Sequence, residues 1–178
     1  MKFTNFNKYF FIYLSFIFLS SVFFITKTYN LDVNNSMAEW IINYQGGFGR
    51  RGFLGEVFSQ ISLIFNFPIR KLILFFLYIF LICYYVMAFF YLKDFKKNYL
   101  FILSLFSPLV FAFPISELEA LGRKDMLIPL FFLSFCLLFK KLNFYFLSIF
   151  LLILYSILLL THEVSIFYLP FFYLLLLK

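Results

Sequence analysis

Residues 72–92, LILFFLYIFLICYYVMAFFYL, form an uninterrupted apolar stretch that decides the fold class of this chain. Arg70 and Lys71 precede the stretch, and Lys93 follows it. An apolar segment of about 20 residues between charged flanks is long enough to cross the hydrocarbon core of a bilayer as a helix. The stretch therefore predicts a membrane-spanning α-helix.

The composition of the whole chain also indicates a lipid environment. Of its 178 residues, 65% are hydrophobic, 26% are aromatic and only 13% are charged. Soluble domains are roughly half apolar, so this chain lies outside their range. Its net charge of +7 does not indicate nucleic-acid binding, because the lysines lie between apolar runs and form no basic stripe. Cys83 and Cys136 both lie inside apolar runs, with neither disulfide nor metal spacing.

Six apolar runs predict an all-α transmembrane helical bundle, in a single domain of residues 1–178. We expect the spans at residues 9–25, 72–92, 99–113, 126–139, 144–160 and 164–177. The first run has the start of a signal peptide, but no small-x-small cleavage site follows it, which favours a retained helix. The last run stops abruptly at Lys178, which indicates a truncated or split chain.

A long polar insert, residues 27–70, separates the first two spans. Residues 36–44 carry a Trp and a Tyr, which favour the headgroup level, and predict a short interfacial helix. Residues 53–67 place Glu56 and Gln60 on one helical face opposite an apolar face, which predicts a second, amphipathic interfacial helix. The alternative is a short span or re-entrant segment, although a glutamate within about 15 residues argues against crossing.

The distribution of charge predicts on which side of the membrane each loop lies. With the N-terminus in the cytoplasm, the inner side receives lysines and a single acid, Asp94, which is the positive-inside pattern. The outer side receives every arginine, the only histidine and seven of the eight acids. We therefore expect a multi-pass protein of the bacterial cytoplasmic (inner) membrane, with its chemistry on the outer face.

The glycine-rich loop from Gly46, GGFGRRGFLG, holds five of the six glycines of the chain. Backbone N–H groups of such a turn can form a concave anion site, and arginine adds forked donors that suit phosphate. We expect phosphate to be bound by Gly47, Gly49, Arg50, Arg51 and Gly52. The spacing is a literal G-x-G-x-x-G, but a dinucleotide site needs a preceding strand, and the sequence predicts none. The alternative is a flexible turn whose arginines meet lipid headgroups.

A second polar cluster precedes the fourth apolar run. Arg123 and Lys124 could hold a second phosphate, or they could pair with Glu117 and Glu119. Asp125 is suited to cap the helix that follows. The sequence leaves both the phosphate site and the internally paired loop open.

A third cluster, His162 and Glu163, separates the fifth and sixth runs. Ionisable groups among membrane helices are costly and are usually functional, here as a proton carrier, a base or a ligand. The alternative is a hairpin tip wetted by headgroups. Asp32 and Glu39, after the first run, are candidates for a base or for ligands of a divalent metal ion, the one cofactor that the sequence suggests.

This pattern resembles the GT-C class of membrane glycosyltransferases, which use sugars linked to polyprenyl phosphate. In that family a long outer loop after the first helix carries an acidic catalytic residue, and basic residues of the outer loops bind the lipid-linked phosphate. The matching features are Asp32 and Glu39, the insert up to Arg70, and the basic residues Arg50, Arg51, Arg123 and Lys124. The chain departs from the family because its acid pair is not adjacent and its spans are fewer.

The resemblance implies a glycosyltransferase or polymerase of cell-envelope polysaccharide at the extracytoplasmic face. The catalytic residues would be Asp32, Glu39, His162 and Glu163. The expected partners are the lipid bilayer, the polyprenyl-phosphate-linked sugar and other membrane subunits. Two alternatives are a non-catalytic transporter or flippase component for a lipid or anionic substrate, which would use the same clusters, and a structural membrane subunit.

Overall fold

A computed structural model describes the chain as a set of helices, without strands in the described residues. It describes residues 6–30, 35–47, 49, 51–95, 98–107, 110–111, 115, 121–139 and 141–176. The elements are α1 (Phe6–Tyr29), α2 (Asn35–Ile41), α3 (Phe53–Phe65), α4 (Ile69–Leu92), α5 (Tyr99–Leu105), the 3-10 helix η1 (Lys124–Met126), α7 (Leu127–Phe139), α8 (Phe144–Thr161), the 3-10 helix η2 (Glu163–Tyr168) and α9 (Leu169–Leu176). The prediction of an all-α fold is confirmed for this part of the chain.

In the part of the chain that the structure describes, three helices, α1, α4 and α8, are long and apolar enough to cross a membrane. α1 and α4 have 24 residues each, and α8 has 18. At a rise of about 1.5 Å per residue, these helices are roughly 36 Å and 27 Å long, against a hydrocarbon core of about 30 Å. They correspond to the first, second and fifth expected spans, and they indicate a membrane protein.

The other three expected spans contain shorter helices. α7 has 13 residues and α5 has 7. α5 ends at Leu105, ahead of Ser107 and Pro108 in the sequence, and a proline disfavours helix at the residue before it. The sixth run opens as η2, and α9 begins at Leu169 with Pro170 in its first turn, where proline is tolerated. The described helices therefore support three of the six expected spans.

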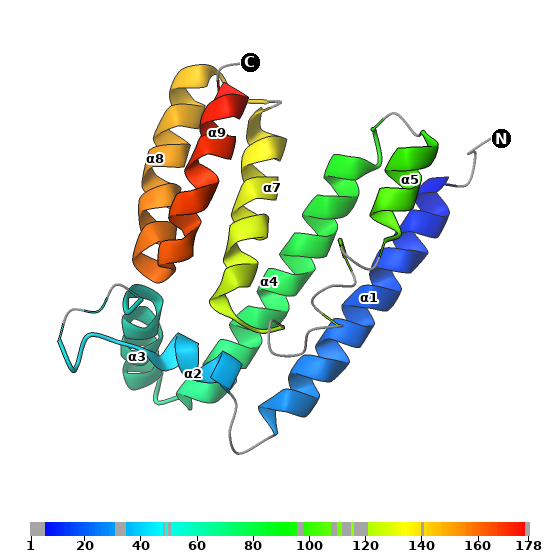
Figure 1. The fold of residues 1–178 in the computed structure, drawn as a ribbon. Coiled ribbons are helices and arrows are strands. Elements are labelled where there is room, and N and C mark those ends of the chain that lie inside the picture. Colours follow the sequence, from blue (N-terminus) through cyan, green and yellow to red (C-terminus); the bar gives the residue numbers. More distant parts are fainter. Residues whose placement is uncertain are drawn as a thin grey trace.

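α1 and α4 run antiparallel and form the centre of the larger hydrophobic core (Figure 1). The buried side chains recur every three or four residues, at Phe10, Leu14 and Ile17 in α1 and at Ile73, Leu77 and Leu81 in α4. Ser21 Oγ lies 3.1 Å from Tyr85 Oη, and Thr26 Oγ1 lies 2.7 Å from Tyr78 Oη. Hydrogen bonds between helices help to hold them together in a bilayer, where burial against a helix gains little over burial against lipid.

A second core lies among α7, α8 and α9, around Phe172. This side chain is fully buried, and its ring centroid lies 5.1 Å from that of Phe131 and 5.2 Å from that of Phe135. α7 contacts α4 on one side and α8 on the other. α7 therefore joins the second core to the first.

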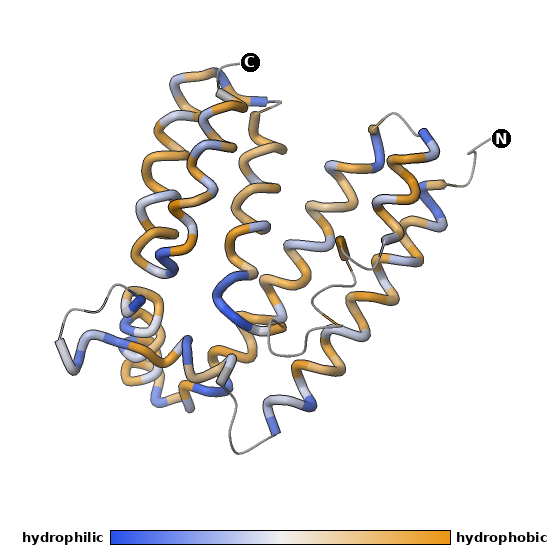
Figure 2. Tube along the Cα trace, in the orientation of Figure 1, coloured by the Kyte–Doolittle hydropathy of each residue, from blue (hydrophilic) through white to orange (hydrophobic). Residues whose placement is uncertain are grey.

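The directions of the helices bring several polar segments to one end of the molecule. α1 ends and α4 begins at the lower side of Figure 1, and α8 ends and α7 begins on the side that faces this end. α2, α3 and η1 lie at the same end, and Figure 2 shows hydrophilic residues in these segments beside the apolar helices. We call this the polar end. The opposite end carries Lys93 after α4 and Lys141 after α7.

Both helices expected in the insert are present; a tryptophan packs them against α4, and a glycine lets α3 approach the end of α2. Trp40 of α2 is 1% exposed, and its ring centroid lies 5.9 Å from those of Phe58 and Phe80. A Cβ added at Gly55 of α3 would overlap the carbonyl oxygen of Ile42, so only glycine permits this close approach. Trp40 is thus a core residue, packed between α3 and α4.

Candidate functional site

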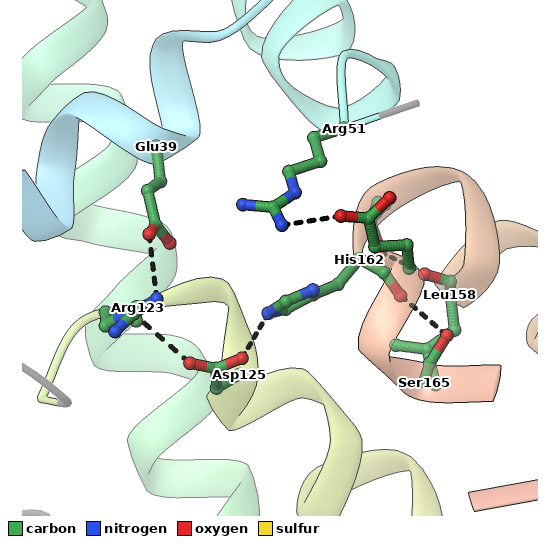
Figure 3. A network of polar contacts seen from close by, with 9 residues as sticks. Glu39, Arg51, Arg123, Asp125, Leu158, His162 and Ser165 are labelled. Carbon is green, nitrogen blue, oxygen red and sulfur yellow. Dashed lines mark hydrogen bonds and ion pairs between the residues drawn. The ribbon is translucent and has the colours of Figure 1, made fainter. Parts of the chain in front are cut away.

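Among the described residues, seven ionisable side chains from separate segments meet at the polar end, and Figure 3 labels Glu39, Arg51, Arg123, Asp125 and His162 among them. They are Glu39 of α2, Arg51 of the glycine loop, Arg123, Lys124 and Asp125 around η1, and His162 and Glu163 where α8 passes into η2. We call this set the polar cluster. With His162 neutral, its three cations balance its three carboxylates.

Ion pairs join the segments of the polar cluster. Arg51 Nη2 donates to Glu163 Oε1 at 2.7 Å. Arg123 Nη2 lies 3.0 Å from Glu39 Oε1, and Arg123 Nε lies 3.4 Å from Asp125 Oδ2. These side chains are between 24% and 44% exposed, so water screens each pair, and each contributes at most about 1 kcal/mol. Their main effect is to fix where the charged groups lie.

Lys124 is a buried cation of the polar cluster. It is 2% exposed, and its Nζ donates to the backbone carbonyl of Arg51 at 2.7 Å. Burial disfavours the charged ammonium, the Glu39 carboxylate favours it, and the Arg51 guanidinium disfavours it again. The net result lowers the pKa of Lys124 from 10.5 to about 8. A lysine with such a pKa can exchange its proton near physiological pH.

The lowered pKa of Lys124 should make the stability of the fold depend on pH. The folded chain releases this proton at about pH 8, whereas the unfolded chain holds it up to the ordinary pKa of 10.5. The unfolded chain therefore binds more protons between these values, and the free energy of unfolding should rise as the pH is raised through this window. Thermal unfolding in detergent from about pH 7 to about pH 10 measures the effect.

Lys124→Met is the variant that isolates this effect, and Lys71→Met is its control because Lys71 is exposed. The Lys124→Met protein should lose the rise that the wild-type protein shows, and the Lys71→Met protein should keep it. An identical pH profile in all three proteins would contradict the prediction.

His162 and Asp125 form a carboxylate–imidazole pair. His162 Nε2 contacts Asp125 Oδ1. The hydrogen bond from His162 lowers the pKa of Asp125, burial opposes this, and the charges of His162, Arg123 and Arg51 lower it further. An ionised carboxylate at Nε2 holds the proton on that nitrogen. In the neutral imidazole the lone pair is then on Nδ1.

Both ring nitrogens of His162 are buried without a hydrogen bond of regular geometry among the described residues; Nε2 is in the ion-pair contact with Asp125, and Nδ1 has no such contact there. The histidine as a whole is 4% exposed, and Nδ1 is on the ring edge that faces away from Asp125 (Figure 3). A buried polar nitrogen without a partner is costly and calls for an explanation. A substrate group that donates a hydrogen bond to Nδ1 would be the missing partner.

The backbone around His162 holds the ring in place. α8 ends at Thr161, and His162 is extended, with φ −154° and ψ 108°. Its N–H donates to the carbonyl of Leu158 at 2.8 Å, and its own carbonyl accepts from Ser165 N at 3.1 Å and from Ser165 Oγ at 2.7 Å. The break between α8 and η2 is therefore a fixed turn that directs the imidazole toward η1.

The glycine loop reaches the polar cluster through Arg51. Gly47 has φ +113°, a conformation that favours glycine. Gly47 N donates to Tyr44 O and Gly52 N to Gly49 O, both at 3.0 Å, so these two N–H groups are used within the loop. Arg50 lies outside the described residues.

Two of the other predicted site residues, Arg123 and Lys124, lie in the polar cluster, where Arg123 pairs with Glu39 and Asp125. Three expected participants lie outside the described residues: Asp32, Glu117 and Glu119. Asp125 is the residue that sequence reasoning missed, because it was expected only as a helix cap. Its position beside the two cations that were singled out is the signal that could have found it.

The polar cluster has no ready-made metal site. Among the described residues, no three His, Cys, Asp or Glu side chains come together as a metal-binding group.

No protein-family model matches the chain, and neither a curated protein nor a solved structure matches it. The chemistry of the polar cluster is therefore the basis for a functional proposal.

Proposed function

We propose that the polar cluster is the active site of a membrane glycosyltransferase that takes sugar from a polyprenyl-phosphate carrier on the extracytoplasmic face. The observation that carries the proposal is the His162–Asp125 pair, with its buried and unpartnered Nδ1. A carboxylate-supported imidazole is a common general base. The cations beside it suit a phosphate leaving group.

The proposed reaction gives each group of the polar cluster a task. The oxygen of the acceptor hydroxyl bonds to the anomeric carbon, and His162 Nδ1 takes the hydroxyl proton. Asp125 stabilises the imidazolium that forms. The bond from the anomeric carbon to the phosphate oxygen breaks, and polyprenyl phosphate leaves with the electron pair. Arg51 and protonated Lys124 stabilise its charge.

The two arginines of the polar cluster have different roles in this proposal. Arg51 pairs with Glu163, and the two side chains are 40% and 44% exposed, so a phosphate group can replace the carboxylate as the partner of Arg51. Arg123 is held by carboxylates on both sides. Glu39 thus serves to orient Arg123, and the proton is taken by His162.

Turnover of a lipid-linked donor tests the proposal. The purified protein is reconstituted in liposomes that contain a polyprenyl-phosphate-linked hexose, and free polyprenyl phosphate is measured by mass spectrometry. We expect release that requires both the protein and an acceptor with a free hydroxyl. Donor binding without release, lost in Arg51→Ala, would favour the transporter or flippase component. Neither binding nor release would favour a structural subunit.

The extracytoplasmic placement makes a separate prediction. Gly49→Cys and Glu163→Cys, each in a background with Cys83→Ala and Cys136→Ala, should react in intact cells with a membrane-impermeant thiol reagent. Lys141→Cys, at the opposite end, should react only after the cells are opened. Lys124 is unsuitable for labelling because it is buried. The reverse labelling pattern would place the polar cluster in the cytoplasm and would contradict the proposed donor.

A further inference from the structure

A cavity of about 420 Å³ lies at the end of the molecule opposite the polar cluster, between the last turn of α4 and the end of α7. Its apolar wall consists of Met87, Phe90, Leu137 and Leu138. Its charged rim consists of Lys93, Asp94 and Lys141. None of these residues has a role in the proposed transfer reaction.

The lysines of this cavity lie where lipid headgroups are expected. α4, which is long enough to span the membrane, ends at Leu92, and Lys93 follows it directly. Lys93 Nζ lies 4.8 Å from the ring centroid of Phe90, so the ammonium stays against the cavity wall. Lys141 comes from the loop after α7 and is exposed. Two cations that follow the ends of different helices thus flank one cavity with an apolar wall.

A second, apolar groove lies beside this cavity and shares Phe90 with it. The groove, of about 250 Å³, lies between α1 and α4, with Phe11 and Phe18 on one side and Ile82 and Val86 on the other. Phe90 lines both the groove and the cavity, and it is 52% exposed. A chain of methylene groups that enters the cavity can therefore pass over Phe90 into the groove.

We propose that the cavity binds an anionic phosphodiester lipid, whose phosphate lies between Lys93 and Lys141 and whose acyl chains cover the apolar wall and the groove. Among the described lining residues, the two lysines and Asp94 carry a net charge of +1, which suits the negative charge of a phosphatidylglycerol-type headgroup. Basic pockets between membrane helices are typical binding sites for anionic lipids. Because the cavity has an apolar wall, we expect it to bind a lipid and not free phosphate.

Native mass spectrometry of the full chain in detergent, titrated with phosphatidylglycerol, tests this site. Each lysine near an anionic headgroup adds electrostatic attraction for the lipid. The double variant Lys93→Ala with Lys141→Ala should therefore bind phosphatidylglycerol roughly 30-fold more weakly. The matched control is Lys27→Ala with Lys71→Ala, which removes the same charge at the polar end and should change binding little. Equal losses in both double variants would show a general charge effect and overturn the proposal.

Two further measurements define the ligand. Asp94→Asn should strengthen phosphatidylglycerol binding, because it removes a carboxylate from the rim. A loss of phosphatidylethanolamine binding in the same variant would instead assign Asp94 to an ammonium headgroup and overturn the anionic assignment. Equally tight binding of soluble glycerophosphoglycerol would show a free-phosphate site. Thermal unfolding of the lysine double variant should match the wild-type protein, and a lowered midpoint would assign the lysines to the fold.

Discussion

Trp40→Ala should lower the free energy of unfolding by about 3–5 kcal/mol, the largest loss of stability that we expect from one substitution in this chain. The indole is 1% exposed and lies between Phe58 of α3 and Phe80 of α4. Its Nε1 also donates to the carbonyl oxygen of Gly122 at 2.6 Å. One side chain therefore joins α2, α3 and α4 to the segment that carries Arg123 and Asp125.

Trp40→Phe separates the packing of the ring from its hydrogen bond. Phenylalanine keeps most of the apolar contact but leaves the Gly122 carbonyl without this donor, which should cost about 1–3 kcal/mol. The buried thiol of Cys136 reports unfolding through its reaction with a thiol dye, in a Cys83→Ala background. Equal unfolding midpoints for Trp40→Ala and the parent protein would contradict the prediction.

The helices could be predicted from the sequence because long apolar runs leave few other possibilities in a membrane. The helix predicted at residues 72–92 is present as α4, which extends from Ile69 to Leu92. The number of spans was harder to predict, because apolar residues that pack on other helices look the same in sequence as those that face lipid. α7, with 13 residues, shows this ambiguity. The burial of Trp40 was equally hard to predict, since it depends on neighbours far along the chain.

The candidate site could be predicted in part. The alternation of helix directions indicated that Arg51, Lys124 and His162 would share one end, and the structure brings them together. The pairing within the polar cluster could not be read from the sequence. Which acid meets His162 depends on the turn at η1 and on the break after Thr161, and neither has a strong sequence signal.

His162→Gln should lower the turnover of the lipid-linked donor by a factor of about 10²–10⁴, the usual contribution of a general base. The glutamine amide can still donate a hydrogen bond to Asp125, but it has no nitrogen basic enough to take a proton. The variant therefore removes the base and keeps the contact that joins α8 to η1. In the liposome assay, kcat should fall while KM changes little, because the loss falls on the transition state.

Two variants separate this catalytic role from a structural one. Asp125→Asn should also lower kcat, because an amide does not hold the His162 proton on Nε2 as a carboxylate does. Glu163→Gln should leave kcat close to the wild-type value, because it removes the ion-pair partner of Arg51 and leaves the imidazole unchanged. If His162→Gln retains full turnover while its unfolding midpoint falls, the His162–Asp125 pair serves only to join α8 to η1. The proposed base would then have to be another group of the polar cluster.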